Sequence, residues 1–272
     1  MRRRLPFTKM HGAGNDFIMV NSSDLGSVVV DSGRIASWCD RRTGIGADGL
    51  IVIGPGVSAG TSFRMTYYNA DGGEAEMCGN GARCSVGFAH ELELVDASGR
   101  FDTGAGVLEG VWHGPEDVEV TLTPWTDLTL DLEMGETPWP ALHSCNTGVP
   151  HLVIPVDDIE DVPLDEWGAR LRYHPAFAPQ GTNVNWVARP ADSGPFLMRT
   201  YERGVEGETL ACGTGASAVA VVLCRLGLAV SQVDLRTRGG DLLTVSIDMD
   251  QGTLRLRGPA VTSFKGEVWI DE

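Results

Sequence analysis

One short motif occurs twice in this chain of 272 residues. The segment Cys78–Ala82, Cys-Gly-Asn-Gly-Ala, recurs 134 positions later as Cys212–Ala216, Cys-Gly-Thr-Gly-Ala. At the same offset, Thr66-Tyr67 matches Thr200-Tyr201. Because the offset is about half the chain length, the pattern predicts a duplicated domain with one cysteine-bearing turn in each half.

Each cysteine turn leads into a segment with helical character. The run Ala216–Leu226 is apolar nearly all round, which predicts a buried helix. The first copy, Asn80–His90, is interrupted by Gly87, but it is long enough to form a central helix as well. The first N–H groups of a helix have no intrahelical partner and can hold a carboxylate. The same end stabilises a thiolate, so each turn combines a base with an anion receptor.

Two such thiols suggest removal of a proton from one face of a carbon and its return to the other face. Zinc binding is disfavoured, because Cys78 and Cys84 are separated by five residues and no C-x-x-C pair exists. A structural disulfide between Cys78 and Cys212 is disfavoured by an acidic chain without a signal peptide, which indicates a reducing compartment. The remaining cysteines are predicted to be core residues: Cys39, Cys84, Cys145 and Cys224.

Four segments give the chain a family resemblance. They are Met10–Phe17 (Met-His-Gly-Ala-Gly-Asn-Asp-Phe), Asn69–Cys84, Gly181–Val184 and Tyr201–Thr209. In sequence and order they resemble the diaminopimelate epimerases. Proline racemases and phenazine-biosynthesis isomerases share the fold of that family, but the first and last segments favour the epimerase branch.

The resemblance implies an α/β (α+β) fold with two pseudo-symmetric lobes, each a curved, mainly antiparallel sheet or barrel around a central helix. We place the N-terminal lobe at residues 1–124, joined by a C-terminal strand at about 260–272, and the C-terminal lobe at 125–259. Strands are predicted from composition and turn signals at 51–53, 63–68, 118–122, 128–132, 152–156, 184–188, 196–201, 233–237, 242–247 and 253–257.

The resemblance also implies an isomerase that interconverts LL- and meso-2,6-diaminopimelate without a cofactor or a metal. In this scheme Cys78 and Cys212 are the catalytic residues, one as thiolate base and the other as thiol acid. The negative charge of a carbanion-like transition state needs fixed donors. Backbone N–H groups at Gly79-Asn80 and Gly213-Thr214 can provide them.

Further polar residues match substrate-binding positions of the family: Asn15, Asn69, Asn183, Glu202 and Arg203. Arg203 is a candidate for bidentate contact with the distal carboxylate. Asn69 and Arg203 each lie nine residues before a cysteine, which favours a functional role for both. His151, together with Glu202, matches family residues that tune a cysteine pKa.

Two positions depart from the family pattern. Many members have asparagine where this chain has Val149, and some have glutamine where it has Gly49. By the internal offset, Val149 corresponds to Asn15 and Gly49 to Asn183. Asn146 or Thr147 could supply the missing contact; otherwise binding is weaker or the distal group of the substrate differs.

Composition limits the partners. A net charge of -16 disfavours nucleic-acid binding. The sequence contains no run of 18 apolar residues, so no membrane span is expected. We expect a cytoplasmic homodimer that acts on a small molecule. The alternatives within enzymes are a proline or hydroxyproline racemase-like enzyme or another isomerase of the superfamily. In a different class, they are a thiol redox or structural protein that uses Cys78 and Cys84, or a non-catalytic binding module.

Overall fold

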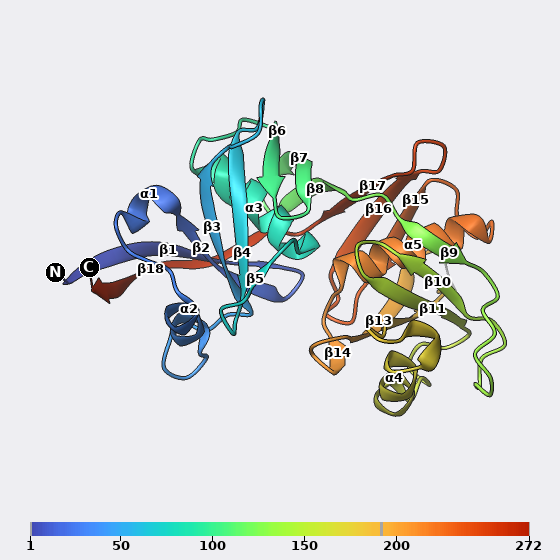
Figure 1. The fold of residues 1–272 in the computed structure, drawn as a ribbon. Coiled ribbons are helices and arrows are strands. Elements are labelled where there is room, and N and C mark those ends of the chain that lie inside the picture. The colour runs from blue at the N-terminus through green and yellow to red at the C-terminus, as the bar shows by residue number, and fades with distance from the viewer. Residues whose placement is uncertain (1, 191–192, 272) are drawn as a thin grey trace. The chain divides into compact units, whose positions relative to one another are not determined.

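A computed structural model describes residues 2–190 and 193–271. The chain forms two compact units (Figure 1): unit 1 comprises Met1–Val120 and Gly258–Glu272, and unit 2 comprises Thr121–Arg257. The sequence placed this boundary at residue 124 and the return to the first lobe at about residue 260. Within the described residues, every helix is too short or too polar to cross a membrane.

Unit 1 contains most of its strands in the first half of the chain. Its helices are α1 (Ser22–Leu25), α2 (Ser32–Cys39) and α3 (Gly79–Glu91). Its strands are β1 (Arg2–Gly12), β2 (Asn15–Asn21), β3 (Gly49–Pro55), β4 (Phe63–Asn69), β5 (Glu74–Ala75), β6 (Ser98–Thr103), β7 (Gly106–Gly114), β8 (Asp117–Leu122, which ends in unit 2) and β18 (Val261–Asp271).

Unit 2 repeats this arrangement. Its helices are α4 (Leu164–Arg172), the 3₁₀ turn η1 (Pro175–Phe177) and α5 (Gly213–Arg225). Its strands are β9 (Thr126–Thr129), β10 (His143–Asn146), β11 (Pro150–Val156), β12 (Asn183–Ala188), β13 (Phe196–Glu202), β14 (Gly207–Thr209), β15 (Gln232–Arg236), β16 (Leu242–Asp248) and β17 (Thr253–Gly258).

The two sheets have the same pairing pattern. In unit 1, β1 and β2 form an antiparallel hairpin, β2 and β3 run parallel, and β3 and β4 run antiparallel. In unit 2, β10–β11, β11–β12 and β12–β13 repeat these three relationships in the same order. The parallel pairs even share their register, since Phe17 faces Gly49 and His151 faces Asn183. The mixed, mainly antiparallel pseudo-symmetric fold predicted from the sequence is confirmed.

One helix is central in each unit (Figure 1). Helix α3 packs against β1, β2, β3, β4 and β7, and α5 packs against β10, β11, β12, β15 and β16. Every residue of α5 from Ala216 to Leu223 is buried, as its apolar composition predicts. The sheet of each unit wraps around its helix. Both helices begin directly after a cysteine, so each cysteine lies at the first turn of its helix.

Smaller helices cover the opposite faces of the two sheets. In unit 1, α2 contributes Ile35 and Trp38 to a cluster with Ile18 and Leu50 of the sheet. In unit 2, α4 contributes Leu171 to a cluster around the fully buried Trp186. Each sheet is therefore covered on both faces, which holds the cysteine-bearing helices in fixed positions within their own units.

Several strands were not predicted. The sequence analysis missed β1, β2, β5, β6, β7, β10 and β14, and it placed β9 two residues too late. Strand β1 begins with three arginines and pairs with β18 along its whole length, so tertiary pairing outweighs its charged start.

The hairpin that follows β4 and the corresponding hairpin that follows β13 differ in length by one residue. In unit 1, Ala75 pairs with Tyr67, and in unit 2, Thr209 pairs with Thr200. Thr209 lies 134 residues after Ala75, but Thr200 lies only 133 residues after Tyr67. The hairpin after β13 is therefore one residue longer than the hairpin after β4. The strand register makes Glu202 the counterpart of Asn69, although Arg203 is the residue at the same distance from its cysteine.

Candidate active site

In unit 1, Cys78 caps the N-terminus of α3 from an extended backbone. Its carbonyl accepts the first helical hydrogen bond from the N–H of Ala82, at 2.7 Å. Its thiol, half-buried, donates to the side-chain oxygen of Asn15 at 3.4 Å. The β1–β2 hairpin therefore brings Asn15 of the sequence-predicted set beside the cysteine.

The asparagine that follows the cysteine joins the same contact. Asn80 Nδ2 donates to Asn15 Oδ1 at 3.3 Å, and Asn80 Oδ1 accepts from Arg83 Nη2 at 2.8 Å. Arg83 is fully buried and also donates to the carbonyls of Pro259 and Gly79. This buried guanidinium anchors the first turn of α3.

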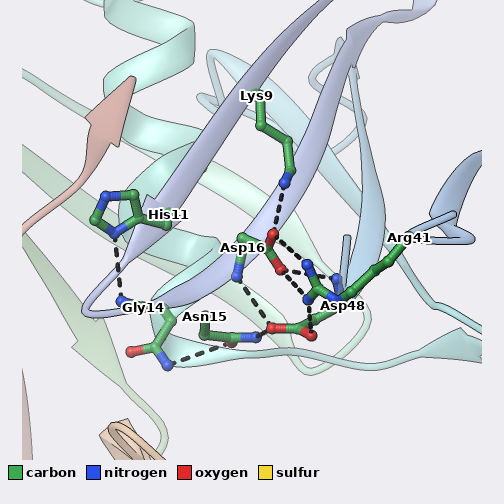
Figure 2. Close-up of polar contacts among 8 residues, drawn as sticks. Lys9, His11, Gly14, Asn15, Asp16, Arg41 and Asp48 are labelled. Carbon is green, nitrogen blue, oxygen red and sulfur yellow. Dashed lines mark hydrogen bonds and ion pairs between the residues drawn. The ribbon is translucent and has the colours of Figure 1, made fainter. Parts of the chain in front are cut away.

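An ionic cluster lies on the other side of Asn15 (Figure 2). Arg41 donates to both carboxylate oxygens of Asp16, at 3.0 and 2.7 Å, and to Asp48 at 2.7 Å. The buried Lys9 ammonium contacts Asp16 as well. Burial opposes ionisation of Asp16, but the hydrogen bonds from Arg41 and Lys9 outweigh it and hold the pKa of this carboxyl well below its usual range. The cluster fixes the loop around residue 48 to β2.

In unit 2, Cys212 caps α5 in the corresponding place and is buried. Its sulfur accepts the backbone N–H of Gly215 at 3.4 Å and lies 3.5 Å from the hydroxyl of Thr214. An N–H donor pointing at sulfur stabilises the thiolate form. Gly213 is buried in the first turn of the helix, as Gly79 is in α3.

His151 lies fully buried on β11. Its Nδ1 is 3.1 Å from Nδ2 of Asn185, an amide nitrogen that can only donate, so Nδ1 is the acceptor and the proton of the neutral ring sits on Nε2. Among the described residues, Nε2 is a buried atom without a hydrogen-bond partner. Burial first, and then the charge of Arg203, lowers the pKa of His151 to about 3.

The amide orientation of Asn185 is itself fixed. Its nitrogen also donates to the carbonyl of Leu152 at 2.9 Å, and its oxygen accepts from the Thr200 hydroxyl at 3.0 Å. The sequence analysis did not select Asn185 or Thr200. Thr200 carried a signal, because this polar residue shares a strand face with the apolar Met198, whereas Asn185 alternates with Val184 and Trp186 and carried none.

The remaining substrate-binding candidates lie around the two hairpins ahead of the cysteines. Asn183 is buried, and its oxygen accepts the backbone N–H of Arg203 at 2.7 Å. Glu202 accepts from the hydroxyl of Thr209 at 2.9 Å. In unit 1, the exposed Asn69 accepts from the hydroxyl of Tyr67 at 2.9 Å. Asn183 thus fixes the start of the loop that carries Arg203.

The structure explains one departure from the family pattern. A Cβ atom on Gly49 would lie 2.4 Å from the backbone oxygen of Tyr68 and 2.7 Å from the ring of Tyr67, so the local backbone excludes a side chain there. Val149 is half-buried, and its carbonyl accepts the N–H of Thr147 at 3.2 Å. The substitutes considered for it are already bonded. Asn146 accepts the N–H of Gly148 at 3.0 Å, and Thr147 donates to Thr214.

The other four cysteines behave differently from Cys78 and Cys212. All six are free. Burial raises the pKa of Cys84 and of Cys145 to about 12 and the pKa of Cys39 to about 11. These three are buried core residues, as predicted, while Cys224 is half-buried, with a pKa raised by burial. In the part of the chain that the structure describes, there is no group of three or more His, Cys, Asp or Glu side chains that could hold a metal ion.

Comparison with known proteins follows the internal duplication. The family model described as diaminopimelate epimerase matches twice, at residues 7–126 and at residues 143–262. The first match contains Cys78 and the second contains Cys212. Each half of the chain is therefore similar to the same family on its own.

Curated relatives agree over nearly the full chain. The diaminopimelate epimerase of Hydrogenobaculum sp. (strain Y04AAS1) is 41% identical over 95% of this chain and 96% of its own length. That of Aquifex aeolicus is 40% identical over 97% and 98%. Among solved structures, a probable proline racemase from Agrobacterium radiobacter K84 superposes with a TM-score of 0.72, at 16% identity over 98% of this chain and 93% of its own.

A second solved structure, a phenazine biosynthesis protein from Bacillus anthracis, has a TM-score of 0.70 at 16% identity, covering 98% of this chain and 100% of its own. At such low identity these two neighbours show the fold alone. The family is shown by the two model matches and by relatives at about 40% identity over almost the whole length. The chain belongs to the diaminopimelate epimerase family.

Proposed function

We propose that this isomerase interconverts LL- and meso-2,6-diaminopimelate by two-base proton transfer at the α-carbon. The observation that carries the proposal is the repeated cysteine at the N-terminus of a buried helix, once in each family-model match. Curated relatives named diaminopimelate epimerase at 36–41% identity support the substrate. The alternative of a proline or hydroxyproline racemase is supported only by structural likeness at 16% identity.

One thiol acts on each face of the α-carbon in this scheme. A thiolate removes the α-proton, the electron pair stays on the substrate, and the other thiol delivers its proton to the opposite face. The roles exchange in the reverse direction, which accounts for a cysteine in both halves. Because an α-proton is a weak acid, the reaction needs donors for the developing charge. The first-turn N–H groups at Gly79-Asn80 and Gly213-Thr214 are suited to this task.

The buried polar groups of unit 2 support selectivity for the substrate. The Nε2–H of His151 is a buried donor without a partner among the described residues, which suits an anionic ligand or the thiolate. Arg203 is our candidate for the distal carboxylate, with Asn183 holding its backbone. Asn15, Asn69 and Glu202 are proposed to bind the amino and carboxylate groups of the substrate.

The reaction class and substrate can be tested together. The purified enzyme is incubated in D₂O with LL-diaminopimelate, proline, hydroxyproline or glutamate, and deuterium at the α-carbon is measured by mass spectrometry. We expect exchange and epimerisation with diaminopimelate alone, unaffected by a chelator or by a carbonyl-trapping reagent. Exchange with proline instead of diaminopimelate would place the chain in the racemase branch.

We further propose a role in lysine biosynthesis, in the cytoplasm, where a reducing environment keeps two reactive thiols free. A homodimer is supported by exposed aromatic side chains of β18, where Phe264 and Trp269 are about half exposed. Light scattering is expected to give twice the chain mass, and Trp269→Glu should weaken the dimer. Val230→Glu, at an exposed residue of unit 2, is the matched control. A monomeric wild type would contradict the dimer.

A further inference from the structure

Four polar side chains of unit 1 form a chain in which every amide has a fixed orientation. Asn15 Nδ2 donates to Asp48 Oδ2 at 2.8 Å. Asp48 also accepts from the Arg41 guanidinium, so it acts as a carboxylate, which can only accept hydrogen bonds. The nitrogen of Asn15 must therefore face Asp48, and its oxygen must face the other way.

The far end of the chain is fixed by a donor-only group. Arg83 Nη2 donates to Asn80 Oδ1, so the nitrogen of Asn80 must face Asn15. That nitrogen donates to Asn15 Oδ1 at 3.3 Å. The Asp48 carboxylate thus orients the amide of Asn15 from one side, and the Arg83 guanidinium orients it from the other side through Asn80. Neither amide can flip without placing two donors or two acceptors together.

This oriented oxygen faces the sulfur of Cys78. The thiol donates to it at 3.4 Å. A thiolate in the same place would meet the lone pairs of a carbonyl oxygen, which is unfavourable, because hydrogen bonding to the neutral form of a group disfavours its charged form. Asn15 therefore favours the thiol of Cys78. If Asn15 turned its nitrogen toward the sulfur, the effect would reverse.

The hydrogen bond to the other cysteine favours the opposite protonation state. Cys212 accepts the Gly215 N–H at 3.4 Å, and this donor favours the thiolate. Both cysteines share the same helix-end position, so the helix dipole acts on both alike. The side-chain and backbone partners make the difference between the two half-sites.

Charged groups around the two sulfurs do not remove this difference. Beside Cys78, Arg83 is occupied by carbonyl oxygens, Cys84 stays a thiol, and Arg41 and Lys9 are bound to acidic side chains. In unit 2, His151 is neutral and the Glu202 carboxylate is bonded to Thr209. Arg203 acts on His151, and its charge helps to keep that ring neutral.

We propose that Asp48 is a positioning residue that orients Asn15 so that the free enzyme carries Cys78 as a thiol and Cys212 as a thiolate. The inference rests on the two-base function proposed above. In the first turnover, the substrate C–H bond breaks as the S–H bond of Cys212 forms, and the S–H bond of Cys78 breaks as the new C–H bond forms. The enzyme then holds the reverse protonation pattern and returns to the starting one by proton exchange with water.

The test measures the protonation of each cysteine without substrate. Intact enzyme is pulsed with iodoacetamide across roughly pH 5 to 10, since only the thiolate reacts, and labelling is read by peptide mass spectrometry. Trypsin cleavage after Arg64 and Arg83 separates Cys78 from Cys84, and fragmentation separates Cys212 from Cys224.

Two substitutions at one position provide the control. Asp48→Ala removes the carboxylate that holds Asn15 Nδ2, so the orientation of the Asn15 amide then depends on its contact with Asn80 and is held less firmly. Asp48→Asn keeps an oxygen where Oδ2 accepts from Asn15 and from the N–H of Asp16, at 3.1 Å, and places an amide nitrogen where Oδ1 accepts from Arg41. We expect Asp48→Ala to move the labelling midpoint of Cys78 down by about one pH unit. We expect no change in Cys212, and no change at either cysteine in Asp48→Asn.

In the wild type, the midpoint of Cys212 should lie below that of Cys78, a comparison that needs no variant to fold. A Cys78 midpoint at or below that of Cys212 would overturn the proposal. So would an unchanged Cys78 midpoint in folded Asp48→Ala, or an equal shift in Asp48→Asn. Because labelling needs no substrate, these results leave the epimerase function untouched, whereas the D₂O exchange with diaminopimelate tests that function alone.

Discussion

The hydroxyl of Thr147 donates a 2.8 Å hydrogen bond to the backbone carbonyl of Thr214, in the first turn of α5. In unit 1 the same place is taken by Gly12, where a Cβ atom would lie 2.9 Å from the carbonyl of Asn80. Asn80 and Thr214 occupy the same position of the repeated motif. The hairpins β1–β2 and β10–β11 therefore hold the cysteine-bearing turns at the same carbonyl. The contact is close packing in unit 1 and a hydrogen bond in unit 2.

Replacing Thr147 with valine should lower stability, because the carbonyl of Thr214 loses a buried partner. A loss of about 1–2 kcal/mol in the free energy of unfolding is expected, measured by urea denaturation. Thr129→Val, at an exposed strand position, should change stability by less than about 0.5 kcal/mol. Equal effects of the two substitutions would show that the bond to Thr214 contributes nothing.

Gly49→Ala should destabilise unit 1. The added Cβ atom would meet the Tyr68 backbone oxygen at 2.4 Å, and backbone in a paired strand cannot move away easily. A cost of about 1–3 kcal/mol is expected, read as a lower melting temperature. Gly207→Ala is the matched strand control, since its Cβ atom would meet nothing within 4 Å. A Gly49→Ala protein as stable as Gly207→Ala would refute the steric account.

His151 should make stability depend on pH in the acid range. Its pKa in the fold is about 3, against an ordinary value of 6.5, so between these values the unfolded chain binds more protons than the folded chain. Stability therefore falls as the pH drops through this window, with a slope of up to about 1.4 kcal/mol per pH unit from this group. Unfolding is measured from about pH 7 to pH 4.

His151→Gln, which cannot titrate, is expected to flatten this dependence. Part of the slope should remain, because burial also lowers the pKa of His143, with Asp131 opposing the shift. If the substitution left the slope unchanged, His151 would not be held neutral by the fold.

Arg203→Ala and Arg203→Lys should both lose catalytic efficiency on LL-diaminopimelate, by roughly one to three orders of magnitude. Lysine lacks the planar two-point geometry that a carboxylate requires. The measurement is kcat/KM, with circular dichroism to confirm folding. Arg238→Ala, which removes an exposed ion pair with Glu160, is the control and should keep full activity. Indifference to Arg203 replacement would exclude it from substrate recognition.

The repeated cysteine motif was sufficient to predict the duplication, the two central helices and the position of each cysteine at a helix start. These features are local, since glycine spacing and apolar runs encode them directly. The exact correspondence between halves was not predictable from the constant offset. One hairpin gained a residue after Glu202, and only strand pairing reveals that Glu202 matches Asn69.

The groups that orient the predicted site residues were also missed. Asp48 lies 33 residues from Asn15 and contacts it only because β2 and β3 pair in parallel. Asn185 reaches His151 across the equivalent pair of strands in unit 2. Such contacts depend on register between distant segments, which periodicity and composition do not specify.

The most direct test of the two-base scheme uses Cys78→Ala and Cys212→Ala with LL- and meso-diaminopimelate in D₂O. Each variant keeps one thiol, so it should lose epimerisation by several orders of magnitude while remaining folded. Wild-type enzyme should incorporate one solvent deuteron at the inverted centre, because the incoming proton comes from a thiol equilibrated with solvent. Near wild-type epimerisation by either variant would contradict the account.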